Sequence, residues 1–229
     1  MAKRRVNDFY PTPAGVTRAL LRRVDLTGRV LECCAGEGHI SNELARHAPG
    51  IADLITNDLD PRFDADLTRD AADPAFWREV GPVDWIVSNP PFDRALDIVE
   101  HAVTHARIGV AMLLRISFLE PTEHGRTARV AADGRPMPAQ RPRAPFLEAN
   151  PPHRLLICPR ISFTGDGRTD SATVAWFVWY RQSYARLGAV EVIREAEAAL
   201  APAVATAPVR LSPDLVAGHE REQMTFVVS

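Results

Sequence analysis

Residues 29–47, RVLECCAGEGHISNELARH, place a short apolar run, a turn with two glycines and an amphipathic segment in immediate succession. The run from Arg29 to Cys33 predicts a buried strand, and the apolar spacing from His39 to His47 predicts a helix. Gly36 and Gly38 let the turn adopt positive φ and approach a ligand closely. In open α/β sheets ligands bind beyond the carboxyl ends of the strands, which is where this turn must lie.

The same alternation of strands and helices extends to both sides of this unit. Helical signals mark residues 14–24, 73–80 and 94–105, and apolar runs mark 52–57, 83–87, 108–115, 154–158 and 172–180. This order predicts an α/β fold, with a mostly parallel sheet and helices on its faces. The length of 229 residues fits one such domain and is short for two.

Two segments depart from the alternation. Residues 121–152 lose periodicity and accumulate proline, glycine and arginine, which predicts either a functional insertion or a disordered loop. The segment after Ala189 is interpreted as a short helix followed by an Ala/Pro linker. We therefore expect a single domain over residues 1–189, which includes the insertion, and a C-terminal extension over 190–229.

Composition narrows the setting of the protein. No run of about 18 apolar residues occurs, so no membrane span is expected, and the basic N-terminus lacks the apolar stretch of a signal peptide. Cys33, Cys34 and Cys158 cannot all pair, and adjacent cysteines rarely bridge, which favours a reduced, cytoplasmic setting. No His/Cys cluster has metal-ligand spacing, so no metal is expected.

Charge is distributed unevenly although the net charge is only -2. Residues 121–160 contain seven arginines against three acidic residues, which leaves the rest of the chain acidic. This local positive patch predicts either a phosphate-contacting surface or an arginine-rich solvated loop.

The next strand after the glycine turn ends in Asn57-Asp-Leu-Asp60. Asp58 lies roughly twenty residues after Gly36, where a carboxylate can accept both hydrogen bonds from a ribose diol. Asp60 is the alternative, and either residue could instead be a turn or cap residue. Ser41 occupies the place of the third glycine of the dinucleotide fingerprint, which argues against NAD and leaves a nucleoside-type ligand.

The most specific motif is Asn89-Pro90-Pro91-Phe92, directly after a buried strand. Two prolines remove two backbone donors and fix φ at both positions. The Asn89 side-chain oxygen and the Pro90 carbonyl can therefore form a rigid pair of acceptors for the two N–H groups of an exocyclic amine. Phe92 offers a face on which a planar base can stack.

Together these motifs resemble those of the gamma class of amino-methyltransferases, in which the cofactor motifs precede the catalytic one. The segment Phe9-Tyr-Pro-Thr-Pro13 matches the family's N-terminal motif, Gly36 and Gly38 its glycine turn, Asp58 its acidic strand end, and residues 89–92 its catalytic motif. Small phage or prophage DNA adenine methyltransferases are most similar. The resemblance covers about residues 8–180 and implies a Rossmann-like S-adenosylmethionine-dependent methyltransferase fold.

The resemblance also implies roles for particular residues. S-adenosylmethionine is expected to contact Tyr10, Pro11, Thr12, Glu32, Ala35, Gly36, Gly38, Asp58, Asp70 and Asn89. Asp70 is expected to contact the adenine of the cofactor, with Asp66 as a competitor. The catalytic residues are expected to be Asn89, Pro90, Pro91 and Phe92. Substrate contacts are expected from Phe92, Phe163, Arg126, Arg129, Arg141 and Arg143, although Phe163 could equally be a core residue.

The implied reaction is direct methyl transfer to the exocyclic amine of adenine in DNA, on a base that is flipped out or already single-stranded. Direct transfer needs no covalent intermediate, so Cys33 and Cys34 are interpreted as packing residues. Enzymes with this motif also methylate base amines in RNA or the glutamine of release factors, so these substrates remain alternatives. A second alternative is an inactive nucleic-acid-binding module on the same fold, although the intact motif argues against it.

Overall fold

The computed structural model describes residues 11–130, 136–137, 139–159, 173–181 and 189–192. Tyr10, Phe163 and most of the predicted C-terminal extension lie outside these residues. The helices are α1 (Ala14–Leu21), α2 (His39–His47), α3 (Pro74–Val80), α4 (Ala95–His105) and α5 (Ala144–Ala149), with a 3-10 helix η2 at Ile116–Leu119. The strands are β1 (Gly28–Glu32), β2 (Ile51–Asp58), β3 (Leu67–Thr68), β4 (Trp85–Ser88), β5 (Gly109–Arg115), β6 (Arg129–Val130), β7 (Pro136–Met137), β8 (Arg154–Ile157), β9 (Val174–Tyr180) and β10 (Ala189–Val192).

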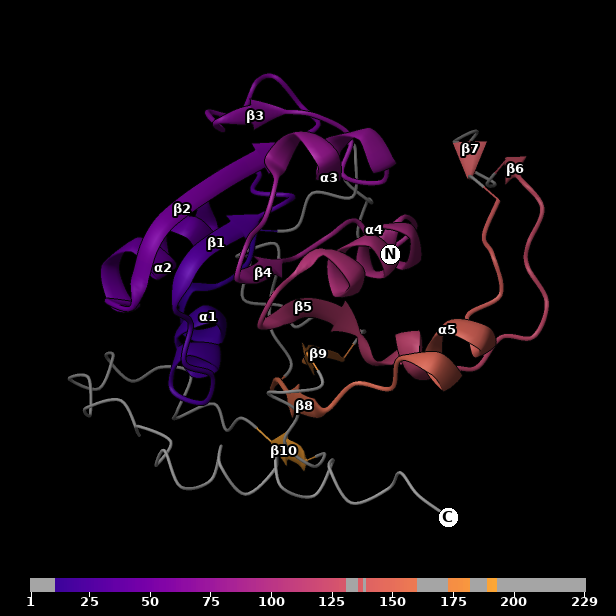
Figure 1. The fold of residues 1–229 in the computed structure, drawn as a ribbon. Coiled ribbons are helices and arrows are strands. Elements are labelled where there is room, and N and C mark those ends of the chain that lie inside the picture. The colour runs from indigo at the N-terminus through magenta and orange to yellow at the C-terminus, as the bar shows by residue number, and fades with distance from the viewer. Residues whose placement is uncertain (1–10, 131–135, 138, 160–172, 182–188, 193–229) are drawn as a thin grey trace, which may run out of the picture.

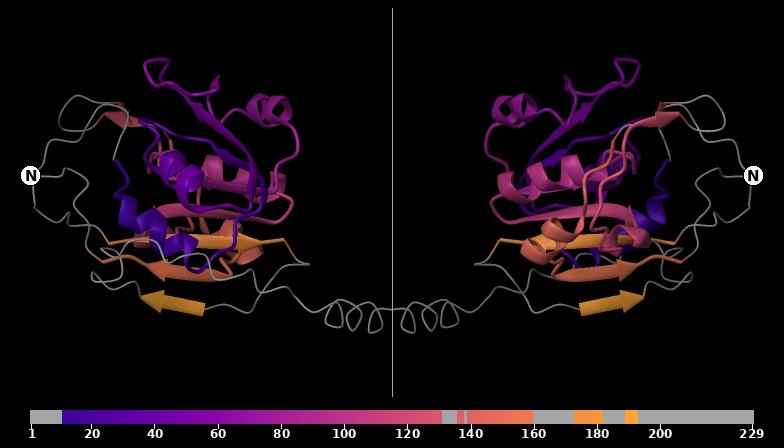
Figure 2. Two further views of the ribbon diagram at one scale, coloured as in Figure 1. Left: turned by 90° about the vertical axis from the view of Figure 1, so that its left-hand side faces the viewer. Right: turned by 90° about the vertical axis from the view of Figure 1, so that its right-hand side faces the viewer.

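Eight strands form one sheet in the order β10-β8-β9-β5-β4-β1-β2-β3 (Figure 1). The neighbours from β5 through β3 pair in parallel, and β10 is parallel to β8. Strand β9 is antiparallel to both β5 and β8, which is visible in Figure 2, where its arrow points against those of β8 and β10. The predicted mostly parallel sheet is confirmed.

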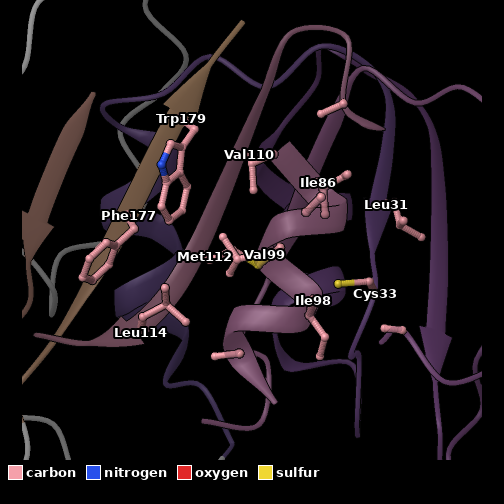
Figure 3. Packing of buried hydrophobic residues seen from close by; sticks show 14 of the residues in the cluster. Leu31, Cys33, Ile86, Ile98, Val99, Val110, Met112, Leu114, Phe177 and Trp179 are labelled. Atoms are coloured by element: carbon pink, nitrogen blue, oxygen red, sulfur yellow. The ribbon is translucent and has the colours of Figure 1, made fainter. Parts of the chain in front are cut away.

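Side chains from alternate positions of the strands feed two hydrophobic clusters. Along β5, Val110, Met112 and Leu114 join one cluster that also contains residues of α3, α4 and α5. Figure 3 shows part of this cluster, where these three side chains lie on the same side of the sheet as α4. Ala111 and Leu113 join the other cluster, which contains residues of α1 and α2. A strand covered on both faces is apolar throughout, which explains the unbroken apolar run of β5 and confirms helices on both faces.

The start of helix α3 is determined by two adjacent residues, Asp73 and Pro74. Asp73 precedes the helix, and its side chain accepts a hydrogen bond from the Ala75 N–H at 2.8 Å. Pro74 occupies the first turn, where the missing N–H has no intrahelical partner anyway. Both features are local, and the sequence therefore placed this helix correctly.

Two predictions about organisation need correction. Ala189–Val192 forms strand β10, which pairs with β8, and not the start of the predicted helix. Four residues are too few for periodicity to separate helix from strand, and pairing with β8 decides between them. The insertion 121–152 is also more ordered than predicted, since it contains β6, β7 and α5 and buries Phe146 in the core.

Candidate cofactor and substrate site

An open pocket of about 850 Å³, including space open to solvent, lies at the carboxyl ends of β1, β2 and β4. Most of the residues predicted to contact the cofactor line it: Pro11, Thr12, Glu32, Ala35, Gly36, Asp58, Asp70 and Asn89. Pro91 of the predicted catalytic motif lines the same pocket. Gly38 lies in the adjoining turn rather than in the pocket wall.

The turn after β1 has the backbone conformation that its glycines predict. Gly36 and Gly38 have φ of 53° and 76°, a left-handed region in which side chains with a Cβ are strained. The Gly38 N–H donates to the Ala35 carbonyl at 2.9 Å and closes the turn. Ser41, in place of a third glycine, donates its hydroxyl to the Gly38 carbonyl at 3.2 Å. The serine therefore braces the start of α2.

Asp58, at the end of β2, is tied to the glycine turn. Its Oδ2 accepts a hydrogen bond from the Gly36 N–H at 2.7 Å, and its Oδ1 accepts one from the Asp60 N–H at 2.9 Å. Asp60 differs because its carboxylate accepts hydrogen bonds from the Arg62 guanidinium. These bonds lower the pKa of Asp60 to about 2. The negative charge of Asp60 is thus partnered by a cation, whereas Asp58 is bonded to backbone amides.

Glu32 is the most unusual group in the pocket wall. Its residue is 1% exposed, and burial raises the pKa of the carboxyl well above its ordinary value, while hydrogen bonds with Ser41 oppose the shift. Among the described residues, its Oε2 has no hydrogen-bond partner. A buried, unmatched carboxyl oxygen is costly on its own, so this atom fits a pocket that receives a cationic or hydrogen-donating ligand.

The structure also separates the two acidic residues proposed for the adenine contact. Asp70 lines the pocket, where Oδ1 accepts from the Ala72 N–H at 2.8 Å and Oδ2 lies 3.4 Å from an Arg94 nitrogen. Asp66 instead accepts from the backbone and hydroxyl of Thr56, at 2.7 and 2.8 Å. The geometry brings Asp70, and not Asp66, to the pocket.

Within the predicted catalytic motif, the Asn89 amide is oriented by a hydrogen bond to the N-terminal segment. Its Nδ2 donates to the Thr12 Oγ1 at 3.1 Å, and Thr12 is itself 3% exposed. Because the nitrogen faces Thr12, the acceptor oxygen is the other end of the same planar group. The predicted N-terminal and catalytic motifs therefore meet in space, 77 residues apart in sequence.

Sequence reasoning missed three residues that hold this region together. The Ser88 hydroxyl accepts from the Cys34 N–H at 3.1 Å and joins the turn after β1 to the end of β4. Buried Asn57 donates to the Cys33 carbonyl at 2.9 Å. The Arg115 guanidinium lies 4.5 Å from the centre of the Phe92 ring. Of these three, only Arg115 could have been noticed in the sequence, because it is a charged residue at the carboxyl end of the otherwise apolar strand β5.

A second hollow of about 530 Å³, including space open to solvent, lies along the segment that follows the predicted catalytic motif. We call it the arm-side hollow because it lies beside the two-stranded arm formed by β6 and β7. Its wall includes Phe92 and three of the arginines predicted to contact substrate: Arg126, Arg141 and Arg143. Arg129, the fourth, begins β6 and pairs with Met137 of β7. The candidate cofactor pocket and the arm-side hollow therefore flank one segment, with Pro91 in the pocket and Phe92 in the hollow.

Two classes of site are absent from the part of the chain that the structure describes. No group of three or more His, Cys, Asp or Glu side chains there is arranged to hold a metal ion. No helix there has both the length and the apolar character needed to cross a membrane.

The strand order, with an antiparallel β9 between β8 and β5, and the site at the carboxyl edge together define the Rossmann-like methyltransferase fold that the sequence predicted. The fold is similar to that of a protein described as the modification subunit of a type I restriction enzyme from Vibrio vulnificus YJ016. That match has a TM-score of 0.51 and 13% identity, and covers 96% of this chain and 54% of the other.

Two further solved structures are similar at lower scores. One is the methyltransferase subunit of a type I restriction-modification system from Streptococcus thermophilus, with a TM-score of 0.48, 15% identity, and 75% and 44% of the two chains covered. The other is described as an O-methyltransferase from Agrobacterium tumefaciens, with a TM-score of 0.49, 14% identity, and 80% and 87% covered. The chain thus spans about half the length of the two restriction-enzyme subunits. No protein-family model and no curated protein matches the sequence.

Proposed function

We propose that this chain is an S-adenosylmethionine-dependent methyltransferase that acts on the exocyclic amine of adenine in DNA. The observation that carries this proposal is the convergence of Asn89 and Pro91 with Gly36 and Asp58 on one pocket. Asn89 is suited to bind an amine, and the glycine turn is suited to bind a nucleoside. Both face the same pocket, and methyl transfer requires the amine and the methyl donor to be held next to each other.

The residues of the pocket fit the proposed cofactor. Asp58 and Asp70 offer carboxylates for the ribose and adenine, and the unmatched Oε2 of Glu32 suits the amino-acid end, which carries an ammonium group. When bound, S-adenosylmethionine supplies a methyl group on a sulfonium, which a nitrogen nucleophile can attack directly.

The motif residues hold and polarise the amine. The Asn89 Oδ1 and the Pro90 carbonyl accept its two N–H groups, which localises the lone pair on nitrogen and stabilises positive charge there. Thr12 keeps the Asn89 amide in the required orientation. Phe92, with Arg115 against its ring, provides the stacking surface.

A covalent cysteine mechanism is disfavoured by the setting of the thiols. Cys33 is buried. A hydrogen bond with Cys33, together with burial, raises the pKa of the Cys34 thiol well above its ordinary value. A thiol that resists ionisation is a poor nucleophile, which supports direct transfer.

We infer DNA as the substrate because the arginine-rich insertion lies beside the motif, and because a similar fold occurs in a protein described as the modification subunit of a type I restriction enzyme. The phage or prophage type rests on the sequence resemblance. The preference is tested with labelled S-adenosylmethionine and, in turn, DNA, ribosomal RNA and release factor. Label in adenine of DNA, lost in Asn89→Ala, supports the proposal. Label in RNA or protein alone would reassign the substrate.

A further inference from the structure

The arm-side hollow is built where a two-stranded arm leaves the domain. Residues 126 and 140 form an antiparallel bridge, with N···O distances of 2.7 and 2.8 Å, and β6 pairs with β7 further along. In Figure 1, β6 and β7 stand away from the main sheet, on the side where α5 lies. The foot of the arm closes over Phe92 and the start of α4, so the hollow borders the catalytic motif.

The three arginines of the hollow differ in how their charge is balanced. Arg141 forms ion pairs with Asp97, at 2.8 Å, and with Glu100 of α4. Its charge is therefore balanced by two carboxylates of α4, and these ion pairs hold the arm against the domain. Arg126 forms no ion pair among the described residues, and the hollow contains Asp93 as a further acidic residue.

Arg143 is the most enclosed of the three, with a side chain that is 22% exposed. Its counterion is Glu120, at 3.7 Å, which is itself 69% exposed. Burial lowers the pKa of Arg143, Glu120 opposes this shift, and the charge of Arg126 adds to it. Arg126 and Arg143 both line this one hollow, so their like charges act on the same space. Two cations held near each other in a hollow are stabilised by an anion that enters between them.

The backbone keeps Arg143 in place. Its N–H donates to the Thr122 carbonyl at 3.0 Å and to the Thr122 hydroxyl at 3.1 Å. The guanidinium also lies 5.8 Å from the centre of the Phe118 ring, which belongs to the core. A cation placed by a paired backbone and a core ring is preorganised for binding.

We propose that the arm-side hollow is the seat for one phosphodiester group of the strand that carries the target base, held jointly by Arg126 and Arg143. The inference rests on the proposed function, because Phe92 of the hollow is the proposed stacking surface for that base. A backbone phosphate is the anion that every nucleic acid presents next to a base, and arginine recognises it through paired donors.

The test measures the affinity for a labelled DNA duplex across a salt series from about 50 to 200 mM. The proteins are the wild type, Arg126→Gln, Arg143→Gln, the double variant, Arg143→Lys, and the matched control Arg46→Gln. Arg46 is on α2, with a side chain that is 65% exposed. One shared phosphate predicts that the double variant loses about 0.9 unit of the salt slope, and that neither single variant loses more. Arg143→Lys and Arg46→Gln keep the wild-type slope.

A loss of about 1.8 units in the double variant would indicate two separate phosphate contacts and overturn the shared seat. An unchanged slope would also overturn it. Cofactor affinity and the melting temperature check that each variant is folded. Methylation of the duplex is assayed in parallel with wild type. Methylation with an unchanged slope leaves the proposed function and removes the phosphate site. A slope change without methylation keeps a phosphate contact at this hollow but removes the proposed function, and with it the link to a target base.

Discussion

Asp58 combines two roles that replacement can separate. Its carboxylate accepts hydrogen bonds from Gly36 and Asp60 and also lines the pocket as the proposed ribose contact. Hydrogen bonds to a charged group contribute about 1.5–3 kcal/mol each when buried, and less at this partly exposed position. We expect Asp58→Ala to lower the free energy of unfolding by about 2–3 kcal/mol. Separately, we expect the binding free energy of S-adenosylmethionine to become less favourable by roughly 2 kcal/mol, which raises the Kd about thirtyfold.

Asp58→Asn isolates the binding effect because it keeps one acceptor oxygen near the turn. Calorimetric titration measures the Kd, and denaturant melts measure stability. Asp60→Asn is the comparator, since its carboxylate is already bonded to Arg62. Asp53→Asn, on the same strand with a side chain that is 57% exposed, is the matched control. An unchanged Kd in Asp58→Asn and Asp58→Ala, with a weakened Kd in Asp60→Asn, would refute the reasoning and move the ribose contact to Asp60.

Three further predictions concern the motif, the buried acid and the core. Asn89→Ala should reduce methyl transfer at least about a hundredfold with the cofactor Kd nearly unchanged, and more than about a tenth of the wild-type rate would contradict its role. The pKa of Glu32 is raised in the folded state, so its contribution to stability is full below pH 4.5 and is lost as pH rises through the folded pKa. Glu32→Gln should therefore flatten that decline in urea melts, and superimposable profiles would count against it. A Cβ at Gly109 would lie 2.7 Å from the Trp85 ring and 2.8 Å from the Trp179 carbonyl. Gly109→Ala should therefore cost about 1–3 kcal/mol of stability, and an unchanged melting temperature would show that the site can adjust.

The parts of the fold and site that the sequence predicted rest on short-range signals. Gly36 and Gly38 mark a turn by their own conformational freedom, and the two prolines after Asn89 cannot donate to the hydrogen-bond ladder of a central strand. An apolar run such as β5 indicates burial on both faces without knowledge of its partners.

The missed features depend on residues that are distant in sequence. The structure pairs Arg141 with Asp97, 44 residues earlier, and no pattern in the sequence indicates this ion pair. The contact of Arg115 with Phe92 likewise requires β4 and β5 to be adjacent in the sheet. Such pairings follow from tertiary packing, so no local pattern contains them.

The closed foot of the arm has an evolutionary consequence. Arg126 and Gln140 face each other across one bridge, and Arg143 returns to Thr122, so the chain leaves and re-enters the domain at nearly the same point. Segments whose ends adjoin can change in length at little entropic cost to the remainder. The stretch between residues 126 and 140 can therefore be replaced or changed in length as a unit. Exchange of this stretch would alter the proposed substrate contacts while the sheet, the glycine turn and the proposed amine-binding motif are inherited intact.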